Sequence, residues 1–309
     1  MMTRGSTRRD SFGFSKARCR ALPVVHRLVT QPSQTLRAKS ASDNGGHKVP
    51  AMYFVIHSPS PETGPEGTFT MSQRPQIIAH RGASKAEKEN TLSAFRRAGD
   101  MASDAVELDV RRTKDGAMAV HHDDHLADGR NIVNLNADEL PDHVPMLNEA
   151  LDACDGMWVN IEIKNWPEDA DFDETDRLAA SVARLLEERN EDARWVISAF
   201  HRPTVEAMRT LAPTVRTAWL TLGVRDEDID KVARDLANSG HIAIHPWDRF
   251  LTRKCVDVCH SHGLQVNVWT VDDPDRMREL IEWGVDGIVT NVPDVALRVR
   301  AEFDGSAPR

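Results

Sequence analysis

The chain has few cysteines, few lysines and no long apolar run. Its four Cys in 309 residues lack the paired spacing of a zinc site, and they do not suggest a disulfide framework. No run approaches the ~20 apolar residues that span a bilayer, so we expect no transmembrane segment. Residues 71–309 hold only six Lys against 23 Arg, and 28 Asp against 16 Glu. Their net charge of −15 opposes binding to nucleic acid or to an anionic membrane.

This composition favours a small soluble substrate over a macromolecular one. An Asp-rich, Lys-poor surface is typical of a saline cytoplasm, where strong net charge sustains solubility. An acidic protein of an ordinary mesophile is the alternative interpretation.

Residues 1–72 differ from the rest of the chain. The first 70 residues contain ten Lys and Arg against four Asp and Glu, a net charge of +6, and show no regular periodicity. We predict a disordered extension, or a misassigned start codon with translation beginning at Met71. An Arg-rich, acid-poor segment also resembles an organelle transit peptide, but no apolar segment indicates secretion. We expect a cytoplasmic protein with a catalytic domain at 73–302 and a tail at 303–309.

From residue 75 onward, apolar runs of strand length alternate with amphipathic segments of helical period. The helical segments include Thr175–Arg189, Pro203–Leu211, Asp226–Asn238, Thr252–His262 and Pro274–Trp283. The strand-like runs end near His80, Arg112, Lys164, Phe200, Thr221, Trp247, Val271 and Asn291. Eight such units predict an α/β fold, a (β/α)8 TIM barrel, with a short insertion after the second strand. Such barrels carry their sites at the carboxyl ends of the strands.

Histidines stand at two of the predicted strand ends. The first strand stops at His80, and Gly82 permits a sharp turn after it. A later strand over Ala117–His122 ends at His122 and is followed by an Asp. Side chains alternate along a strand, so we expect His121 to face away from the site and only His122 to act there.

Three carboxylates are predicted to converge. Glu107 and Asp109 lie two residues apart in a strand and therefore share a face. Burying both without a partner would cost several kcal/mol, which a divalent cation with oxygen ligands resolves. Glu162, in another strand, can complete such a site, and Lys164 can face a phosphate oxygen. A structural pairing of the first two carboxylates with Arg111 is the alternative.

These motifs resemble those of the glycerophosphodiester phosphodiesterase family. The resemblance spans roughly residues 75–300. Its matching segments are His80-Arg81-Gly82, Glu89-Asn90-Thr91, Glu107-Leu108-Asp109-Val110, Thr113-Lys114-Asp115-Gly116, His122-Asp123, Glu162-Ile163-Lys164, Val268-Trp269-Thr270 and the run from Gly284 to Pro293. The segment 126–129 departs from the family pattern, and it belongs to a region that often shapes the alcohol pocket.

The resemblance implies a role for each matching residue. The general acid and base would be His80 and His122, and the phosphate would be bound by Arg81 and Lys164. The ligands of one divalent ion, Mg²⁺ or Ca²⁺ with Mn²⁺ as a further candidate, would be Glu107, Asp109 and Glu162. Residues that support or line the pocket would be Glu89, Asn90, Phe200 and Trp269, although core packing of Trp269 is an almost equal alternative.

The implied reaction is hydrolysis of a small glycerophosphodiester to glycerol 3-phosphate and an alcohol. General acid and base catalysis at the metal site would proceed through a cyclic phosphate. One rival is a lysophospholipase D-like or phospholipase C-like enzyme acting on lipids, which an exposed apolar rim would favour. The other is a non-catalytic barrel that binds phosphodiesters.

Overall fold

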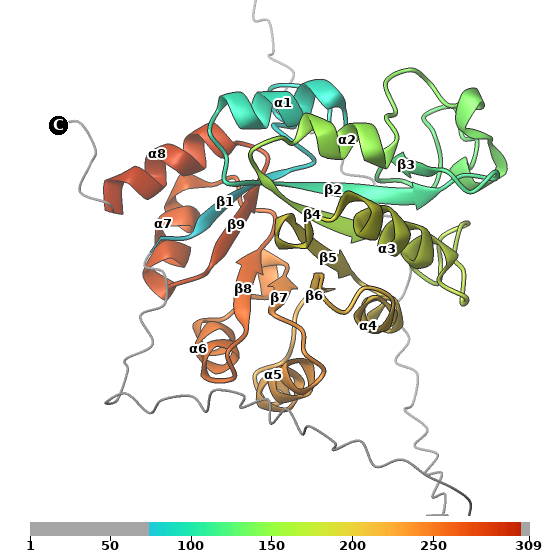
Figure 1. Ribbon diagram of the computed structural model, residues 1–309. Helices are drawn as coiled ribbons and strands as arrows, with labels where there is room; N and C mark the ends of the chain where they lie inside the picture. Colours follow the sequence, from blue (N-terminus) through green and yellow to red (C-terminus); the bar gives the residue numbers. More distant parts are fainter. Residues whose placement is uncertain (1–73, 304–309) are drawn as a thin grey trace, which may run out of the picture. The chain divides into compact units, whose positions relative to one another are not determined.

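The computed structural model describes residues 74–303 (Figure 1). The extension predicted for residues 1–72 lies outside the described residues, as do residues 304–309. No helix within 74–303 has both the length and the apolar character needed to cross a bilayer.

Eight parallel strands form a closed barrel. Neighbours follow chain order, and β1 closes the barrel by pairing with both β2 and β9. The barrel strands are β1 (Gln76–His80), β2 (Ala105–Arg112), β4 (Trp158–Ile163), β5 (Trp195–Ala199), β6 (Arg216–Thr221), β7 (Ala243–Pro246), β8 (Gln265–Val268) and β9 (Gly287–Thr290). The predicted TIM barrel is confirmed, and the strands end close to the predicted positions.

Helices surround the barrel (Figure 1). They are α1 (Leu92–Asp100), α2 (Leu147–Ala153), α3 (Arg177–Arg189), α4 (Arg202–Leu211), α5 (Ile229–Asn238), α6 (Arg253–Ser261), α7 (Pro274–Trp283) and α8 (Pro293–Phe303). Side chains cap the starts of some of them: the Thr91 hydroxyl accepts from the Ala94 amide at α1, and Asp273 caps α7 ahead of Pro274. One apolar face of each helix packs on the barrel.

The predicted insertion lies between β2 and α2. It contains β3 (Met118–Val120), which pairs antiparallel with β2, and the short 3-10 helices η1 (Ile132–Asn134) and η2 (Ala137–Glu139). Its own small core includes Leu126 and Val144. The strand β3 is shorter than the predicted strand Ala117–His122. The His121 amide still bonds to the Asp109 carbonyl at 3.0 Å, but the chain then turns away.

In strand β2, successive side chains alternate between the layer beneath the helices and the barrel interior. Val106, Leu108 and Val110 pack outward in the layer beneath the helices. The alternating residues Glu107 and Asp109 face the barrel interior, where they are also buried. A fully buried strand therefore carries both the core and the acidic groups, near the carboxyl end where barrel enzymes place their sites.

The turn after β1 needs glycine at one position. Gly82 has φ +81°, and an added Cβ would lie 2.6 Å from the carbonyl carbon of Ala94, the third residue after the helix cap Thr91. Arg81 and Asn90 also adopt positive φ, at 57° and 55°. Left-handed backbone in non-glycine residues is uncommon and clusters at functional sites.

Replacing Gly82 by Ala should destabilise the barrel strongly. We expect Gly82→Ala to lower the free energy of unfolding by about 2–5 kcal/mol, since the left-handed conformation costs about 1–2 kcal/mol and the overpacking about 1–3 kcal/mol. Gly116→Ala is the matched control, because Gly116 has φ +86° and open space around it. The control should lose only about 1–2 kcal/mol. Urea unfolding measures the stability of both variants. Equal losses would show that the start of α1 shifts to accommodate the added Cβ without a loss of stability.

Candidate active site

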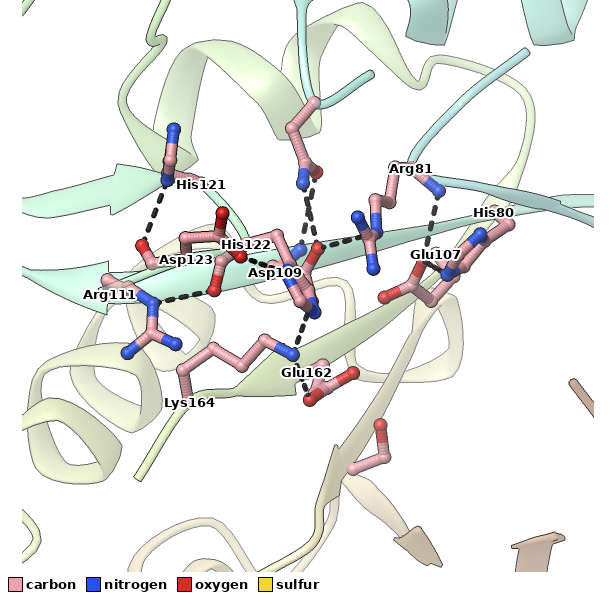
Figure 2. Close-up of polar contacts among 12 residues, drawn as sticks. His80, Arg81, Glu107, Asp109, Arg111, His121, His122, Asp123, Glu162 and Lys164 are labelled. Carbon is pink, nitrogen blue, oxygen red and sulfur yellow. Dashed lines mark hydrogen bonds and ion pairs between the residues drawn. The ribbon is translucent and has the colours of Figure 1, made fainter. Parts of the chain in front are cut away.

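Three buried carboxylates meet at the carboxyl end of the barrel. Asp109 of β2 pairs in register with Glu162 of β4, and Glu107 stands two residues before Asp109. One carboxylate oxygen from each lies within 4.8 Å of the others, and the residues are only 4%, 1% and 7% exposed. The predicted convergence of Glu107, Asp109 and Glu162 is therefore present in the fold (Figure 2).

Two cations neutralise part of this charge. The Lys164 ammonium lies 3.0 Å from Asp109 Oδ1 and 2.6 Å from Glu162 Oε1. Arg81 Nε lies 3.2 Å from Asp109 Oδ2, and the Arg81 backbone amide donates to Glu107 Oε2 at 2.9 Å. Three carboxylates against two cations leave one uncompensated negative charge.

Burial and the neighbouring charges shift the pKa values of the two β2 carboxyls in opposite directions. Burial, together with the adjacent Asp109 and Glu162, raises the pKa of Glu107 well above its usual range. Burial also opposes ionisation of Asp109, but Lys164 and Arg81 outweigh it and hold the pKa of Asp109 well below its ordinary value. Asn90 Nδ2 adds a hydrogen bond to Asp109 Oδ2 at 2.8 Å.

The same groups fit a divalent cation. Hard ions such as Mg²⁺ and Ca²⁺ take carboxylate oxygens as ligands. Glu107 Oε1 is buried and has no hydrogen-bond partner among the described residues, so one oxygen of the cluster is free to serve as a ligand. A bound divalent ion would also change the net charge of the cluster from −1 to +1, which suits an anionic substrate.

His80 is held in one tautomer. The amide of Asn291 is oriented by Asp272, which accepts from Asn291 Nδ2 at 2.7 Å. Asn291 Oδ1 therefore faces His80 Nδ1, at 2.7 Å, and the ring must donate from Nδ1. Burial, followed by the charge of Arg81, lowers the pKa of His80 to about 4. The neutral ring therefore presents Nε2 as an acceptor toward the site, 3.9 Å from Glu107 Oε2.

His122 lies beyond the end of β3 and contacts an acid. Its Nδ1 is 2.6 Å from Asp123 Oδ1. The prediction that His121 faces away from the carboxylates agrees with the structure, as Figure 2 shows. His121 lines a neighbouring small cavity that His122 also borders.

Arg111 does not pair with Glu107, Asp109 or Glu162. Its guanidinium donates to Asp171 at 2.7 Å, to Asp169 at 3.0 Å and to the His122 backbone carbonyl at 2.7 Å. The alternative in which Arg111 neutralises the β2 acids is therefore wrong, because the side chain extends toward the loop after β4. Arg111 instead ties that loop to His122.

Two adjoining cavities open around these groups. The inner one, of about 50 Å³, is lined by His80, Arg81 and two of the three acids, Glu107 and Glu162. The outer one, of about 490 Å³, extends over the loops that follow β3, β4 and β5. Residues lining both are His122, Glu162, Lys164 and Phe200.

Aromatic side chains wall the inner cavity as predicted. Phe200 meets Trp269 edge to face at 5.5 Å, and Trp269 stacks on Trp247 at 6.2 Å. The Trp269 indole also donates to the His245 carbonyl at 2.9 Å. Trp269 thus both packs against its neighbours and faces the cavity. Glu89 accepts from Arg81 Nη1 at 2.9 Å at the rim.

The Glycerophosphoryl diester phosphodiesterase family model matches residues 80–295. The chain belongs to this family. A glycerophosphodiester phosphodiesterase of Caldanaerobacter subterraneus subsp. tengcongensis is 29% identical over 247 residues, which cover 72% of this chain and 96% of that protein. One from Bacillus subtilis is 27% identical over 266 residues, 77% of this chain and 90% of that one.

The fold of this chain also matches that of a solved structure. An Oleispira antarctica phosphodiesterase, in complex with the product sn-glycerol-3-phosphate, superposes with a TM-score of 0.66 at 23% identity. The match covers 73% of this chain and 96% of that one. The family assignment, the barrel and the recognised motifs of this chain therefore agree with one another.

Sequence reasoning missed three polar residues of the family site. Asn291 orients His80, and its position just after the last strand was the available signal. Asn160 faces Glu107 across the β2–β4 register; its Nδ2 donates to Ser198 while its Oδ1 stays buried without a partner. His245 lines the inner cavity, and burial lowers its pKa to about 3.

Removing Arg111 should damage both stability and turnover. We expect Arg111→Met to lower the free energy of unfolding by about 3–5 kcal/mol, because it leaves buried Asp171 without its cation. Turnover should fall as well, since the His122 carbonyl loses its donor. Arg130→Met is the control: Arg130 is exposed and pairs only within its own loop, so the loss should stay within about 0.5 kcal/mol. Urea unfolding and initial rates measure both, and wild-type stability of Arg111→Met would contradict this account.

Proposed function

We propose that this protein hydrolyses glycerophosphodiesters to glycerol 3-phosphate and an alcohol at the three-carboxylate site. One observation carries the proposal: two acids of a buried acidic triad, Glu107 and Glu162, and the two cations beside it line a cavity that His80 and His122 also line. This arrangement combines charge for an anionic phosphate with two groups able to move protons. Family membership agrees with the same reaction.

In this proposal Glu107, Asp109 and Glu162 hold one divalent cation. When bound, such an ion neutralises phosphate oxygens and stabilises the charge that develops on them. Arg81 and Lys164 lie against the same carboxylates and add positive charge toward the phosphate. With the ion and a phosphodiester monoanion present, the five side chains, ion and substrate sum to zero net charge.

The hydrogen bonds of the two histidines favour different roles. His80 donates from Nδ1 to Asn291, so its Nε2 is free to accept a proton. His122 Nδ1 instead contacts the Asp123 carboxylate, an anionic partner that His80 lacks at its own Nδ1. We therefore assign His80 as the base and His122 as the acid of the first step.

In the first step the glycerol 2-hydroxyl oxygen attacks phosphorus and gives its proton to His80 Nε2. The bond from phosphorus to the alcohol oxygen breaks, and that oxygen takes a proton from His122. The products of this step are the free alcohol and a cyclic glycerol phosphate. Attack within one molecule benefits from proximity, because the hydroxyl is already positioned near phosphorus.

In the second step water opens the ring with the roles reversed. His122, now neutral, takes a proton from the attacking water, and His80 returns its proton to the 2-oxygen. Glycerol 3-phosphate is released and both histidines regain their starting states. The aromatic walls Phe200 and Trp269 exclude bulk water from the carbon atoms, while Asn90 and Glu89 hold Asp109 and Arg81 in place.

The metal proposal predicts a change in stability as well as in activity. Chelation should abolish turnover, and Mg²⁺, Ca²⁺ or Mn²⁺ should restore it. The ion should also raise the thermal midpoint, since it binds the folded state and relieves the repulsion among three buried acids. Glu107→Gln should lose most of that rise, whereas Glu89→Gln, at the exposed rim, should keep it. Calorimetry with and without chelator measures this, and full activity in excess chelator would contradict the proposal.

The histidine roles predict a dependence on the leaving group. His80→Ala and His122→Ala should each lose about 10²–10⁴-fold in turnover of glycerophosphocholine. With the p-nitrophenyl diester, whose phenolate leaves without a proton, His122→Ala should recover most of its first-turnover rate while His80→Ala should not. His121→Ala is the control and should match the wild type. Nitrophenolate release in a stopped-flow instrument measures the first step alone, and recovery by His80→Ala instead would reverse the assignment.

A further inference from the structure

We propose that the outer cavity binds the alcohol group of the substrate and selects small alcohols that carry a positive charge, such as amino- or trimethylammonium alcohols. This inference rests on the proposed function, and it adds a specificity that the family resemblance does not determine. It depends on the shape, charge and aromatic lining of the cavity.

The two cavities divide the substrate between them. The inner cavity, of about 50 Å³, is too small for both arms of a diester. It contains a buried acceptor without a hydrogen-bond partner among the described residues, Asn160 Oδ1, which suits a hydroxyl group of glycerol. The second arm must then pass His122 into the outer cavity, whose volume of about 490 Å³ is within the range of ligand pockets.

The wall of the outer cavity is negative. Asp123, Asp124 and Asp169 line it, and Arg111 is balanced by Asp169 and the buried Asp171 behind it. These four carboxylates against one guanidinium sum to −3 when the neighbouring histidines are neutral. Even with His122 and His125 both protonated the sum remains −1. Lys164 also borders the cavity, but its ammonium is paired with Asp109 and Glu162.

Two aromatic side chains lie beside this acidic wall. Trp166, in the loop after β4, meets Phe200 edge to face at 6.0 Å, and both line the outer cavity. Trp166 is 45% exposed, so its ring is accessible to a ligand in the outer cavity. A ring face next to carboxylates attracts ammonium groups by cation–π and Coulomb interactions together. A neutral polyol gains neither, and an anionic alcohol is repelled.

The test compares three diesters that share the glycerol phosphate arm: glycerophosphocholine, glycerophosphoglycerol and glycerophosphoserine. Release of glycerol 3-phosphate gives kcat/KM for each. We expect the choline ester to be the best of the three. Trp166→Ala should reduce kcat/KM for the choline ester by about 2–30-fold, since a cation–π contact contributes about 0.5–2 kcal/mol. The value for glycerophosphoglycerol should fall less, since its neutral alcohol makes no cation–π contact.

Matched variants separate recognition from general damage. Trp166→Phe should retain most of the choline preference, and Phe303→Ala, an exposed aromatic on α8, should leave all three values unchanged. Asp124→Asn keeps an acceptor for the Ala170 amide but removes a charge from the wall, so the preference for the choline ester over glycerophosphoglycerol should fall. Asp128→Asn, exposed in the same loop and outside the cavity, is its control.

The possible results distinguish a failure of the proposed specificity from a failure of the proposed hydrolase function. Equal kcat/KM for the three diesters, or a Trp166→Ala loss that is the same for all, overturns the specificity and leaves the hydrolase function standing. Strong preference for lysophosphatidylcholine over glycerophosphocholine would assign the cavity to an acyl chain instead and overturn the inference. No turnover of any diester overturns the proposed function and this inference with it.

Discussion

The mutual repulsion of Glu107, Asp109 and Glu162 is the constraint on which the rest of the site depends. Three carboxylates within 4.8 Å of one another in a buried position are unstable unless positive charge is held beside them. Lys164 is buried in the interior for this reason, and Arg81 adopts a left-handed backbone that lets both its amide and its guanidinium contact the acids. The turn with Gly82 then has little freedom to vary.

The barrel accommodates the repulsion among these carboxylates because the hydrophobic packing of their strands is on the outward face. The outward residues of β2 and β4 are apolar and pack beneath α1, α2 and α3, so the inward positions contribute little to the hydrophobic core. Polar residues can occupy the carboxyl end of the barrel interior without loss of the main stabilising contacts. Functional sites commonly keep such strained and charged groups at a cost that the scaffold offsets.

Arg111 connects the two halves of the site. The same guanidinium fixes the His122 carbonyl, neutralises buried Asp171 and borders the outer cavity through Asp169. The loops after β3 and β4 are therefore held in one arrangement around the position assigned to the leaving alcohol. In this geometry the residue proposed to protonate the alcohol and the wall proposed to recognise it share one anchor, which links substrate choice to proton transfer.

The sequence alone determined the fold class and most of the site, because both depend on local patterns. Strand and helix periods specify eight units, and the two-residue spacing of Glu107 and Asp109 places them on one face whatever the rest of the chain does. The partners that come from distant segments could not be obtained in this way. Asn291 reaches His80 only because β9 closes the barrel against β1. The partners of Arg111 and the joining of Trp166 to the acidic wall likewise depend on how long loops fold back over the barrel, and side-chain contacts between loops follow no sequence period.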